Sequence, residues 1–556
     1  MRRHVENGGL TVHAVAGNHA VFFGFDLADE VRAGCLGFAI RREDLTDHSA
    51  RWMSGFKTFR SQVAEPNLTA AYPTETNPIQ GMWWGDYTTK PGHSYRYTVV
   101  PRYGSPDELT SRDSVSATLD VTTNDPDAGI HGIYFNRGVA ASQAYAARFG
   151  DPPDQLPPDR RAAALTWLSR GLHEALIAFL TTDAGPALAL RAAVYEFTEP
   201  SVLAAFAQAR AAGAEVQVVY HADGDQGALN EAAIQAAGLD RAMLIPRTHA
   251  VIAHNKFVVR ADRLADATLA AAQVWTGSTN LSQGGIFGHS NVGHAVRDPG
   301  VARAYLGYWA ELSGDPTAHP LKTWVSANST FNGAAEATAG IHTLFSPRMD
   351  LRPLDWYAAG FTGSTATAHI TLPFGLDDKH FEPAVTAMAA DGPLRFVMLN
   401  TQDDHQDTWS RDQAIQVAVG AEGGPDVLSR WAKETLTGFN GHVDYLHTKI
   451  LLVGALGETP TTISGSANFS EASTTSNDEN MLVIAGDRDV ADVYFTEYMR
   501  IFQHFYARWW AAKLGTAGAD SHSFLTEDDS WQAPYWTMSP KSRERDLYAH
   551  QVGGNG

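Results

Sequence analysis

The chain has 556 residues, 44% of them hydrophobic and 19% charged, with a single cysteine. Such a composition excludes wholesale disorder, one cysteine excludes an intrachain disulfide, and the length predicts more than one hydrophobic core. The 42 Lys and Arg against 62 Asp and Glu leave a net charge of −20, which repels polyanions at long range but still permits a local basic cleft that binds phosphate.

No signal-peptide pattern follows the N-terminal arginines, and no run of 18 apolar residues occurs anywhere. The sequence therefore predicts a soluble cytoplasmic protein without a transmembrane segment. Export by a route that needs no cleaved signal would leave the same sequence pattern.

Residues 1–125 have the pattern of an all-β domain. Runs rich in β-branched and aromatic residues recur between Gly, Pro, Asn and Asp, at 10–16, 20–27, 35–42, 95–103 and 116–123. Short strands at this spacing predict a β-sandwich. The segment resembles a fibronectin-type or immunoglobulin-like module.

From residue 130 onward, apolar strands alternate with Ala-rich helical stretches, which predicts an α/β fold. Four landmarks then occur twice in the same order: HNKFVVRAD, WTGSTNLS, SNVGHAV and a helix at 301–312, followed by LHTKILLVG, ISGSANFS, ENMLVIA and a helix at 490–510. We therefore expect duplicated domains at 130–335 and 336–515, and a C-terminal tail at 516–556.

Each copy carries a His-x-Lys motif on a predicted strand. Residues i and i+2 of a strand point to the same face, so His254 shares a face with Lys256, and His447 with Lys449. A Gly-Ser-x-Asn motif follows each of them, and its serine and asparagine are neutral hydrogen-bond donors. Two imidazoles, two ammonium groups and four neutral donors suit one tetrahedral oxyanion. The four donors are Ser278, Asn280, Ser466 and Asn468.

These paired motifs resemble those of the phospholipase D superfamily, and the resemblance covers roughly residues 130–512. It implies two α/β/α sandwich domains that pack about a pseudo-twofold axis and share one active site, so that a monomer suffices. It also implies hydrolysis through a phosphohistidine, with no metal and no cofactor. One histidine attacks phosphorus and the other protonates the leaving oxygen, while Lys256, Lys449, Asn280 and Asn468 hold the non-bridging oxygens.

The sequence departs from the family pattern in both copies. Asp262 comes one residue later than the family's supporting aspartate, and Gly454 replaces that aspartate in the second copy. Glu479-Asn480 matches a trailing Glu-Asn whose carboxylate orients a histidine, whereas the first copy has Ser290-Asn291. Family habit makes His254 the nucleophile, but Glu479 in the second copy favours His447; both assignments stay open.

Other residues have simpler interpretations. The two serines form turns in many proteins, the two asparagines cap helices, and Glu479 is a common loop acid. His289, His294 and His405, the last within an acidic stretch, match no standard zinc spacing, and we interpret them as loop residues. The aromatic helix ending at Trp509 and Trp510 is predicted to pack inside the protein.

The substrate is the least determined part of the prediction. The negative charge, the length and the extra β-domain favour hydrolysis of a phospholipid or small phosphodiester, with peripheral membrane contact compatible with that role. A nuclease is the alternative, because the motifs GSANFS and ENMLVI are similar in sequence to those of the family's endonucleases. A third hypothesis, from another class, is an inactive scaffold that binds partners through the β-domain.

Overall fold

The computed structural model describes residues 1–63, 70–138, 142–376, 379–388, 392–401, 414–420, 445–522 and 524–550. For residues 142–143 and 508–522 only the backbone is described. His405 with its acidic neighbours, and the side chains of Trp509 and Trp510, therefore lie outside the described part.

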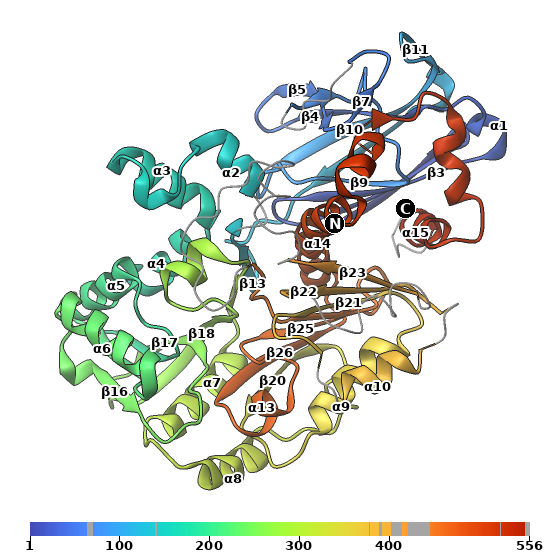
Figure 1. The fold of residues 1–556 in the computed structure, drawn as a ribbon. Helices are drawn as coiled ribbons and strands as arrows, with labels where there is room; N and C mark the ends of the chain where they lie inside the picture. The colour runs from blue at the N-terminus through green and yellow to red at the C-terminus, as the bar shows by residue number, and fades with distance from the viewer. Residues whose placement is uncertain are drawn as a thin grey trace.

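The N-terminal segment forms two antiparallel sheets (Figure 1). Inward and outward residues alternate along the strand Ala117–Thr122, where Ala117, Leu119 and Val121 are buried. One sheet has the order β1-β2-β3-β9, and the other β11-β10-β4-β5, with β12 also on β10. Their bounds are β1 Arg2–Asn7, β2 Leu10–Ala16, β3 Val21–Leu27, β4 Gly37–Asp44, β5 Ser49–Trp52, β9 Trp83–Asp86, β10 Ser94–Ser105, β11 Glu108–Ser111 and β12 Ala117–Thr122.

Short elements connect these sheets. They are α1 Asp29–Arg32, the 3₁₀ turn η1 Asp113–Val115, and the two-residue strands β6 Ser54–Gly55, β7 Thr58–Phe59 and β8 Tyr72–Pro73.

A seven-stranded sheet, which we call the sheet of the first half, has the order β13-β19-β18-β17-β14-β15-β16. Its strand β14 is buried along its whole length, as expected of a strand covered on both faces. The strands are β13 His131–Phe135, β14 Leu188–Val194, β15 Glu215–His221, β16 Leu244–Arg247, β17 Lys256–Arg263, β18 Leu269–Gly277 and β19 Val292–Val296.

Helices cover the first half (Figure 1). They are α2 Ser142–Phe149, α3 Pro158–Ser169, α4 Leu172–Thr181, α5 Pro200–Ala211, α6 Gly224–Ala237, α7 Pro299–Leu312 and α8 Ala318–Asn328. Shorter turns are η3 Pro153–Gln155, η4 Arg241–Met243 and the π-helical η5 Gly284–Gly288.

The sheet of the second half repeats this arrangement strand for strand, in the order β20-β26-β25-β24-β21-β22-β23. The strands are β20 Gly340–Ser346, β21 Ala368–Leu372, β22 Arg395–Leu399, β23 Ile415–Val419, β24 Ile450–Val453, β25 Thr461–Gly465 and β26 Glu479–Ala485. The helices are α9 Arg352–Gly363, α10 Phe381–Thr386, α13 Glu471–Thr475 and α14 Arg488–His522. The equal strand order agrees with the duplication that the sequence predicts.

One continuous apolar core joins the two halves. It includes Phe257 and Val259 of β17, Leu452 of β24, Tyr305 of α7 and Tyr498 of α14, all fully buried. Because both sheets bury side chains in this core, the halves are held at a fixed distance, and the ends of their strands can meet.

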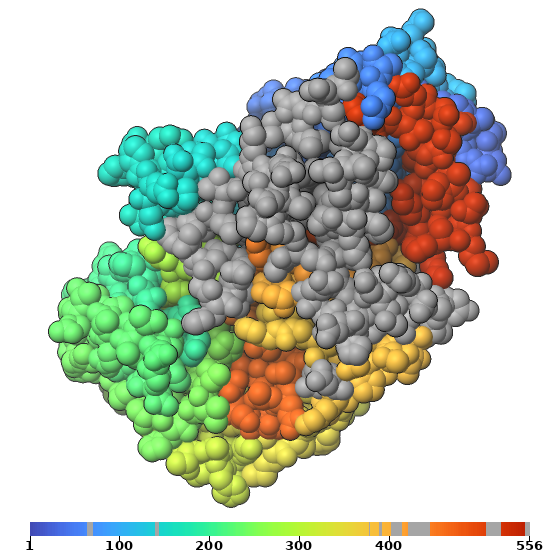
Figure 2. Space-filling view, in the orientation of Figure 1, coloured from blue at the N-terminus to red at the C-terminus, as the bar shows by residue number. Residues whose placement is uncertain are grey.

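The C-terminal residues fold back on the N-terminal sheets. Trp531 and Tyr535 belong to the core of those sheets, and Trp531 Nε1 donates to the Cys35 carbonyl at 2.9 Å. In Figure 2 the red C-terminal surface lies directly against the blue N-terminal one. The elements are β27 Phe524–Leu525, which pairs with β7, then η6 Asp529–Tyr535 and α15 Pro540–His550.

Among the described residues, no helix combines the length and the apolar character needed to cross a membrane.

Candidate active site

Two short strand-to-strand bridges connect the halves at their His-x-Lys motifs. Ala253 pairs with Asp478, and the His254 amide donates to the Asp478 carbonyl at 3.0 Å. Ser290 pairs with Leu446, and the His447 amide donates to the Ser290 carbonyl at 3.2 Å. Each bridge therefore sets the start of a His-x-Lys strand in one half beside the start of β26 or β19 in the other.

The two imidazoles meet at this junction. The ring centroids of His254 and His447 are 6.4 Å apart, with an interplanar angle of 76°. Each residue keeps a small exposed fraction, 8% for His254 and 4% for His447. Burial lowers the pKa of His254 to about 4 and that of His447 well below its usual value, so both rings are neutral at neutral pH.

The acceptor for His254 comes from the second half. Its Nδ1 lies 2.9 Å from both carboxylate oxygens of Glu479, so Nδ1–H donates and Nε2 carries the lone pair. Ser466 Oγ donates to the same carboxylate at 2.6 Å. Although burial alone would raise the pKa of Glu479, the His254 ring and Lys256 hold it below its usual value. The expectation that Glu479 orients His447 is therefore wrong, because the bridge to Ala253 carries β26 across to the other half.

The acceptor for His447 comes from the first half. Its Nδ1 lies 3.0 Å from Asn291 Oδ1, which also accepts from Ser278 Oγ at 2.8 Å. Asn291 Nδ2 donates to the Gly285 carbonyl, which fixes the amide orientation. Asn291 follows Ser278 by 13 residues, just as Glu479 follows Ser466. Asn291, not Ser290, is thus the counterpart of Glu479, and the site remains asymmetric, with a neutral amide opposite a carboxylate.

Both motif serines are used inside the protein. Ser278 and Ser466 are fully buried. The Ser278 hydroxyl accepts from the Val292 amide at 3.1 Å, and the Ser466 hydroxyl accepts from the Asn480 amide at 3.0 Å. The prediction that their hydroxyls bind phosphate is wrong: they position Asn291 and Glu479.

The motif glycines permit the close approach of the strands that these hydrogen bonds connect. A Cβ on Gly277, whose φ is +127°, would lie 2.3 Å from the Val292 carbonyl oxygen, and one on Gly465 would lie 2.2 Å from that of Asn480. Only glycine allows strands β18 and β19, or β25 and β26, to approach so closely here.

The two lysines lie beside the histidines, as the strand alternation predicts. Lys256 Nζ donates to the His254 carbonyl at 2.6 Å, and Lys449 Nζ to the His447 carbonyl at 2.8 Å. Burial lowers the pKa of Lys256 to about 7, and burial together with Lys256 lowers that of Lys449 well below its usual value. Both amino groups are buried with few anions around them, and a bound anion would raise their pKa values.

Each motif asparagine has a buried amide oxygen without a donor. Asn280 Oδ1 and Asn468 Oδ1 are buried, and neither has a hydrogen-bond partner among the described residues. A buried acceptor without a donor is costly, so its presence at the equivalent position of both motifs indicates a place for a water or for a ligand group that donates.

Two predicted supporting residues have different outcomes. Asn480 is buried at the junction: its Nδ2 donates to Asn255 Oδ1 at 2.8 Å, and its Oδ1 accepts from Thr276 and Tyr305 at 2.6 and 3.0 Å. Asp262 is exposed and pairs with Leu188, whereas Lys256 pairs with Val194 at the other end of β14. Six residues along a strand span about 20 Å, so Asp262 has no contact with the site and its predicted role is wrong.

Three residues near the histidines were missed or set aside in the sequence. The Tyr195 ring lies 5.2 Å from the His254 ring and 5.2 Å from Lys256 Nζ. Glu196 acts electrostatically on both lysines. His289 packs against His447, with ring centroids 4.9 Å apart. Tyr195 and Glu196 directly follow β14, and side chains at the end of such a strand are the signal that could have identified them.

His294, in contrast, lies within β19, where its Nε2 contacts His131 Nδ1 at 2.9 Å and its Nδ1 contacts the Tyr494 hydroxyl at 3.1 Å. It belongs to the packing of β13 and α14.

Within the described chain, one group of side chains has the spacing of metal ligands, and it lies in the N-terminal segment: Asp44, Asp47 and His93. Asp44 accepts from two backbone amides, and Asp47 pairs with Lys90. These oxygens are thus already occupied.

No known protein family matches the sequence, and no curated protein matches it. Among solved structures, the chain is similar to a phosphatidylserine synthase from Haemophilus influenzae, with 12% identity over 64% of this chain and 94% of that one and a TM-score of 0.42. A polyphosphate kinase from Porphyromonas gingivalis matches with 12% identity over 58% of this chain and a TM-score of 0.36, and less than half of the kinase, 46%, is covered. A phospholipase D family member from Salmonella typhimurium, Nuc, matches with 20% identity over 26% of this chain and 87% of its own, with a TM-score of 0.21.

Because the buried amino groups of Lys256 and Lys449 have few anions around them, the site should bind orthovanadate, a tetrahedral oxyanion, tightly in excess chelator. Replacing Lys449 by Met removes a charged donor, and the Kd for vanadate should rise about tenfold to a hundredfold, measured by isothermal titration calorimetry. The exposed Lys90, changed to Met, is the matched control and should leave the Kd unchanged. Equal binding by the wild type and the Lys449→Met variant would show that the anion does not sit at the histidines.

Proposed function

We propose that the chain is a metal-independent phosphodiesterase that works through a phosphohistidine. The observation that carries this proposal is the meeting of His254 and His447, whose ring centroids are 6.4 Å apart, with Lys256 and Lys449 beside them. The two lysines can neutralise the charge of a phosphoryl group, which is the work that a divalent cation does in other phosphoryl-transfer sites, and the Nδ2 groups of Asn280 and Asn468 can donate to its oxygens.

The roles of the two histidines follow from the hydrogen-bond acceptors that their Nδ1 atoms contact, Glu479 for His254 and Asn291 for His447. When His254 Nε2 attacks phosphorus, its ring becomes cationic, and the Glu479 carboxylate stabilises that cation. Asn291 gives His447 only a neutral acceptor, so a proton on His447 Nε2 is released more readily. We therefore assign His254 as nucleophile and His447 as general acid.

The reaction then has two displacement steps. First, the His254 Nε2 lone pair forms a P–N bond, one P–O ester bond breaks, and the leaving oxygen takes the proton of His447 Nε2. Second, His447 takes a proton from water, the resulting hydroxide attacks phosphorus, and the P–N bond breaks. Burial lowers the pKa of His447 in the free enzyme, and a bound phosphodiester anion favours its protonated form.

The duplicated architecture supports one site per chain. We propose domains at 130–335 and 336–515 that are related by a pseudo-twofold axis, with the β-rich segment at 1–125 before them. The equal strand orders and the paired bridges support this, because each half supplies to the other what its own histidine lacks.

For the substrate we propose a phospholipid or another small phosphodiester. The net charge of −20 and the carboxylate of Glu196 beside the lysines both work against binding of a polyanionic nucleic acid. An alcohol in place of water in the second step would give transfer instead of hydrolysis by the same chemistry.

Hydrolysis of bis(p-nitrophenyl) phosphate in excess chelator is the direct test. The wild type should release p-nitrophenolate, and His254→Ala should lower kcat/KM at least about a thousandfold, because the nucleophile is lost. The exposed His319, changed to Ala, is the control and should retain full activity. Chelator-sensitive hydrolysis, or equal rates for His254→Ala and the wild type, would refute the mechanism.

Trapping of the intermediate distinguishes the two histidines. p-Nitrophenolate leaves without help from an acid, so His447→Ala should still form a p-nitrophenyl phosphoryl adduct on His254 but hydrolyse it slowly. Intact-protein mass spectrometry should show this adduct in His447→Ala and none in His254→Ala. The reverse pattern would make His447 the nucleophile.

The pH dependence of kcat/KM for bis(p-nitrophenyl) phosphate, whose leaving group needs no acid from His447, should be bell-shaped. In the free enzyme, activity needs a neutral His254, which becomes protonated below its pKa of about 4, and a protonated Lys256, which loses its charge above its pKa of about 7. Activity should therefore fall as the pH drops below about 4 and as it rises above about 7. A kcat/KM that stays constant up to pH 9 would contradict the role of Lys256 as a cation.

A further inference from the structure

The residues that follow β14 in the first half are polar, whereas those that follow the equivalent strand β21 in the second half are apolar. Strands β14 and β21 occupy equivalent places, and Val194 pairs with Lys256. In the second half, Ile370 of β21 pairs with Leu451 of β24. Two residues further along the same antiparallel register, Leu372 lies opposite Lys449. The residues that follow are Tyr195 and Glu196 in the first half but Pro373 and Phe374 in the second.

On the polar side, Glu196 faces the lysines. Its carboxylate accepts from Ser282, two residues after Asn280, and acts electrostatically on both Lys256 and Lys449. Tyr195 stands over Lys256 and beside His254. Both Tyr195 and Glu196 are partly exposed, so a ligand at the histidines can reach them.

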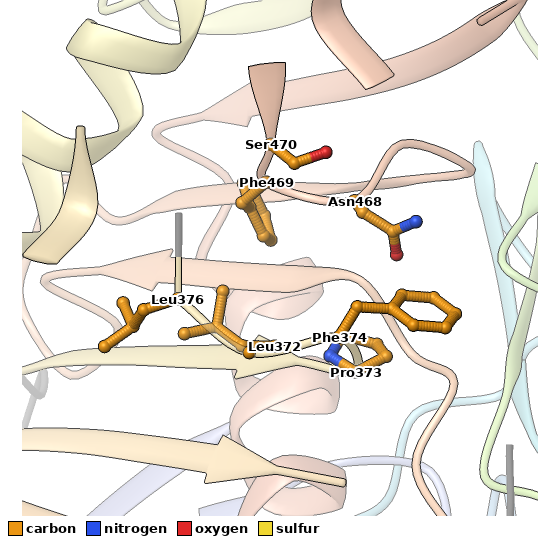
Figure 3. Close-up of a pocket in the computed structure, with 8 residues that line it drawn as sticks. Leu372, Pro373, Phe374, Leu376, Asn468, Phe469 and Ser470 are labelled. Atoms are coloured by element: carbon orange, nitrogen blue, oxygen red, sulfur yellow. The ribbon is translucent and has the colours of Figure 1, made fainter. Parts of the chain in front are cut away.

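On the apolar side there is a cavity of about 240 Å³ (Figure 3). Ser470, the counterpart of Ser282, lies on its wall, but Phe374 replaces the glutamate that would contact it. Phe374 lines the cavity and is 61% exposed, so the ring is accessible from outside. The lining consists of Leu372, Pro373, Phe374, Gly375, Leu376, Asn468, Phe469 and Ser470.

The cavity adjoins the phosphate site. Asn468, whose buried Oδ1 has no partner among the described residues, both lines the cavity and belongs to the Gly-Ser-x-Asn motif. In Figure 3 the Asn468 amide and the Phe374 ring lie on the same side of the cavity. A group in the cavity can therefore be joined through one ester oxygen to a phosphorus held by the motif.

We infer that the substrate is an amphipathic phosphodiester whose two esters are told apart by Phe374 and Glu196. This inference rests on the proposed phosphodiesterase function. An aliphatic ester lies in the cavity of Phe374 and Phe469, and an ammonium-bearing ester lies before Glu196 and Tyr195. A nucleic acid has sugars on both sides of each phosphate, gains nothing from the cavity, and would bring further phosphates toward Glu196.

The test compares two substrates that differ only in their acyl chains: dihexanoyl phosphatidylethanolamine and glycerophosphoethanolamine, both below any micelle concentration and in excess chelator. Ethanolamine release by the wild type should give a kcat/KM at least about tenfold higher for the acylated substrate, because apolar contacts are worth that much per few carbons. Phe374→Ala should reduce this ratio about tenfold.

Phe56→Ala is the matched control, since Phe56 in the N-terminal segment is 62% exposed, nearly as much as Phe374. It should keep the wild-type ratio. An unchanged ratio in Phe374→Ala, or a higher kcat/KM for oligothymidylate than for the acylated substrate, would overturn the inference and leave the phosphodiesterase intact. Failure to hydrolyse either compound and bis(p-nitrophenyl) phosphate would instead overturn the proposed function and the inference with it.

Glu196→Gln tests the polar side. The ratio of kcat/KM for the ethanolamine head group to that for the uncharged glycerol head group, with the same acyl chains, should fall about tenfold, because a carboxylate–ammonium contact is lost. The ratio cancels any general effect of Glu196 on the lysines. A ratio equal to that of the wild type would place the ammonium elsewhere.

Discussion

The site depends on an exchange of hydrogen-bond acceptors between the two halves of the chain. His254 of the first half donates to Glu479 of the second, and His447 of the second half donates to Asn291 of the first. The strand bridges Ala253 to Asp478 and Ser290 to Leu446 set both contacts. Neither half contains a complete histidine with its acceptor, so the shared core that fixes the distance between the sheets is also what assembles the site.

The same burial leaves the positively charged groups of the site with few anions. Two lysines and two imidazoles share one carboxylate at the centre, Glu479, with Glu196 nearby. Removing ammonium groups from water is costly unless an anion compensates, and the lowered pKa values of Lys256 and Lys449 express this cost. The phosphodiester anion of the proposed substrate supplies negative charge, so its binding would be coupled to protonation of the site.

In the proposed mechanism, the differences between the two halves give the reaction a direction. A symmetric pair of histidines would have no reason to assign attack to one and proton transfer to the other. The neutral acceptor Asn291, opposite the carboxylate Glu479, distinguishes the two rings, and Phe374, at the position equivalent to Glu196, distinguishes the two proposed ester sides. Both differences lie at equivalent positions, so each changes one role while the fold stays the same.

The sequence alone determined what depends on local periodicity and on order along the chain. The alternation of a strand places Lys256 beside His254 and Lys449 beside His447, and the repeated landmarks predict equal strand orders. Only the tertiary structure decided which residues meet across the halves. Glu479 lies near His447 in sequence but contacts His254, Ser278 and Ser466 hold acceptors instead of substrate, and Asp262 lies at the far end of its strand. These outcomes depend on pairing between distant segments, which is set by the packing of two sheets on one core and leaves no local pattern.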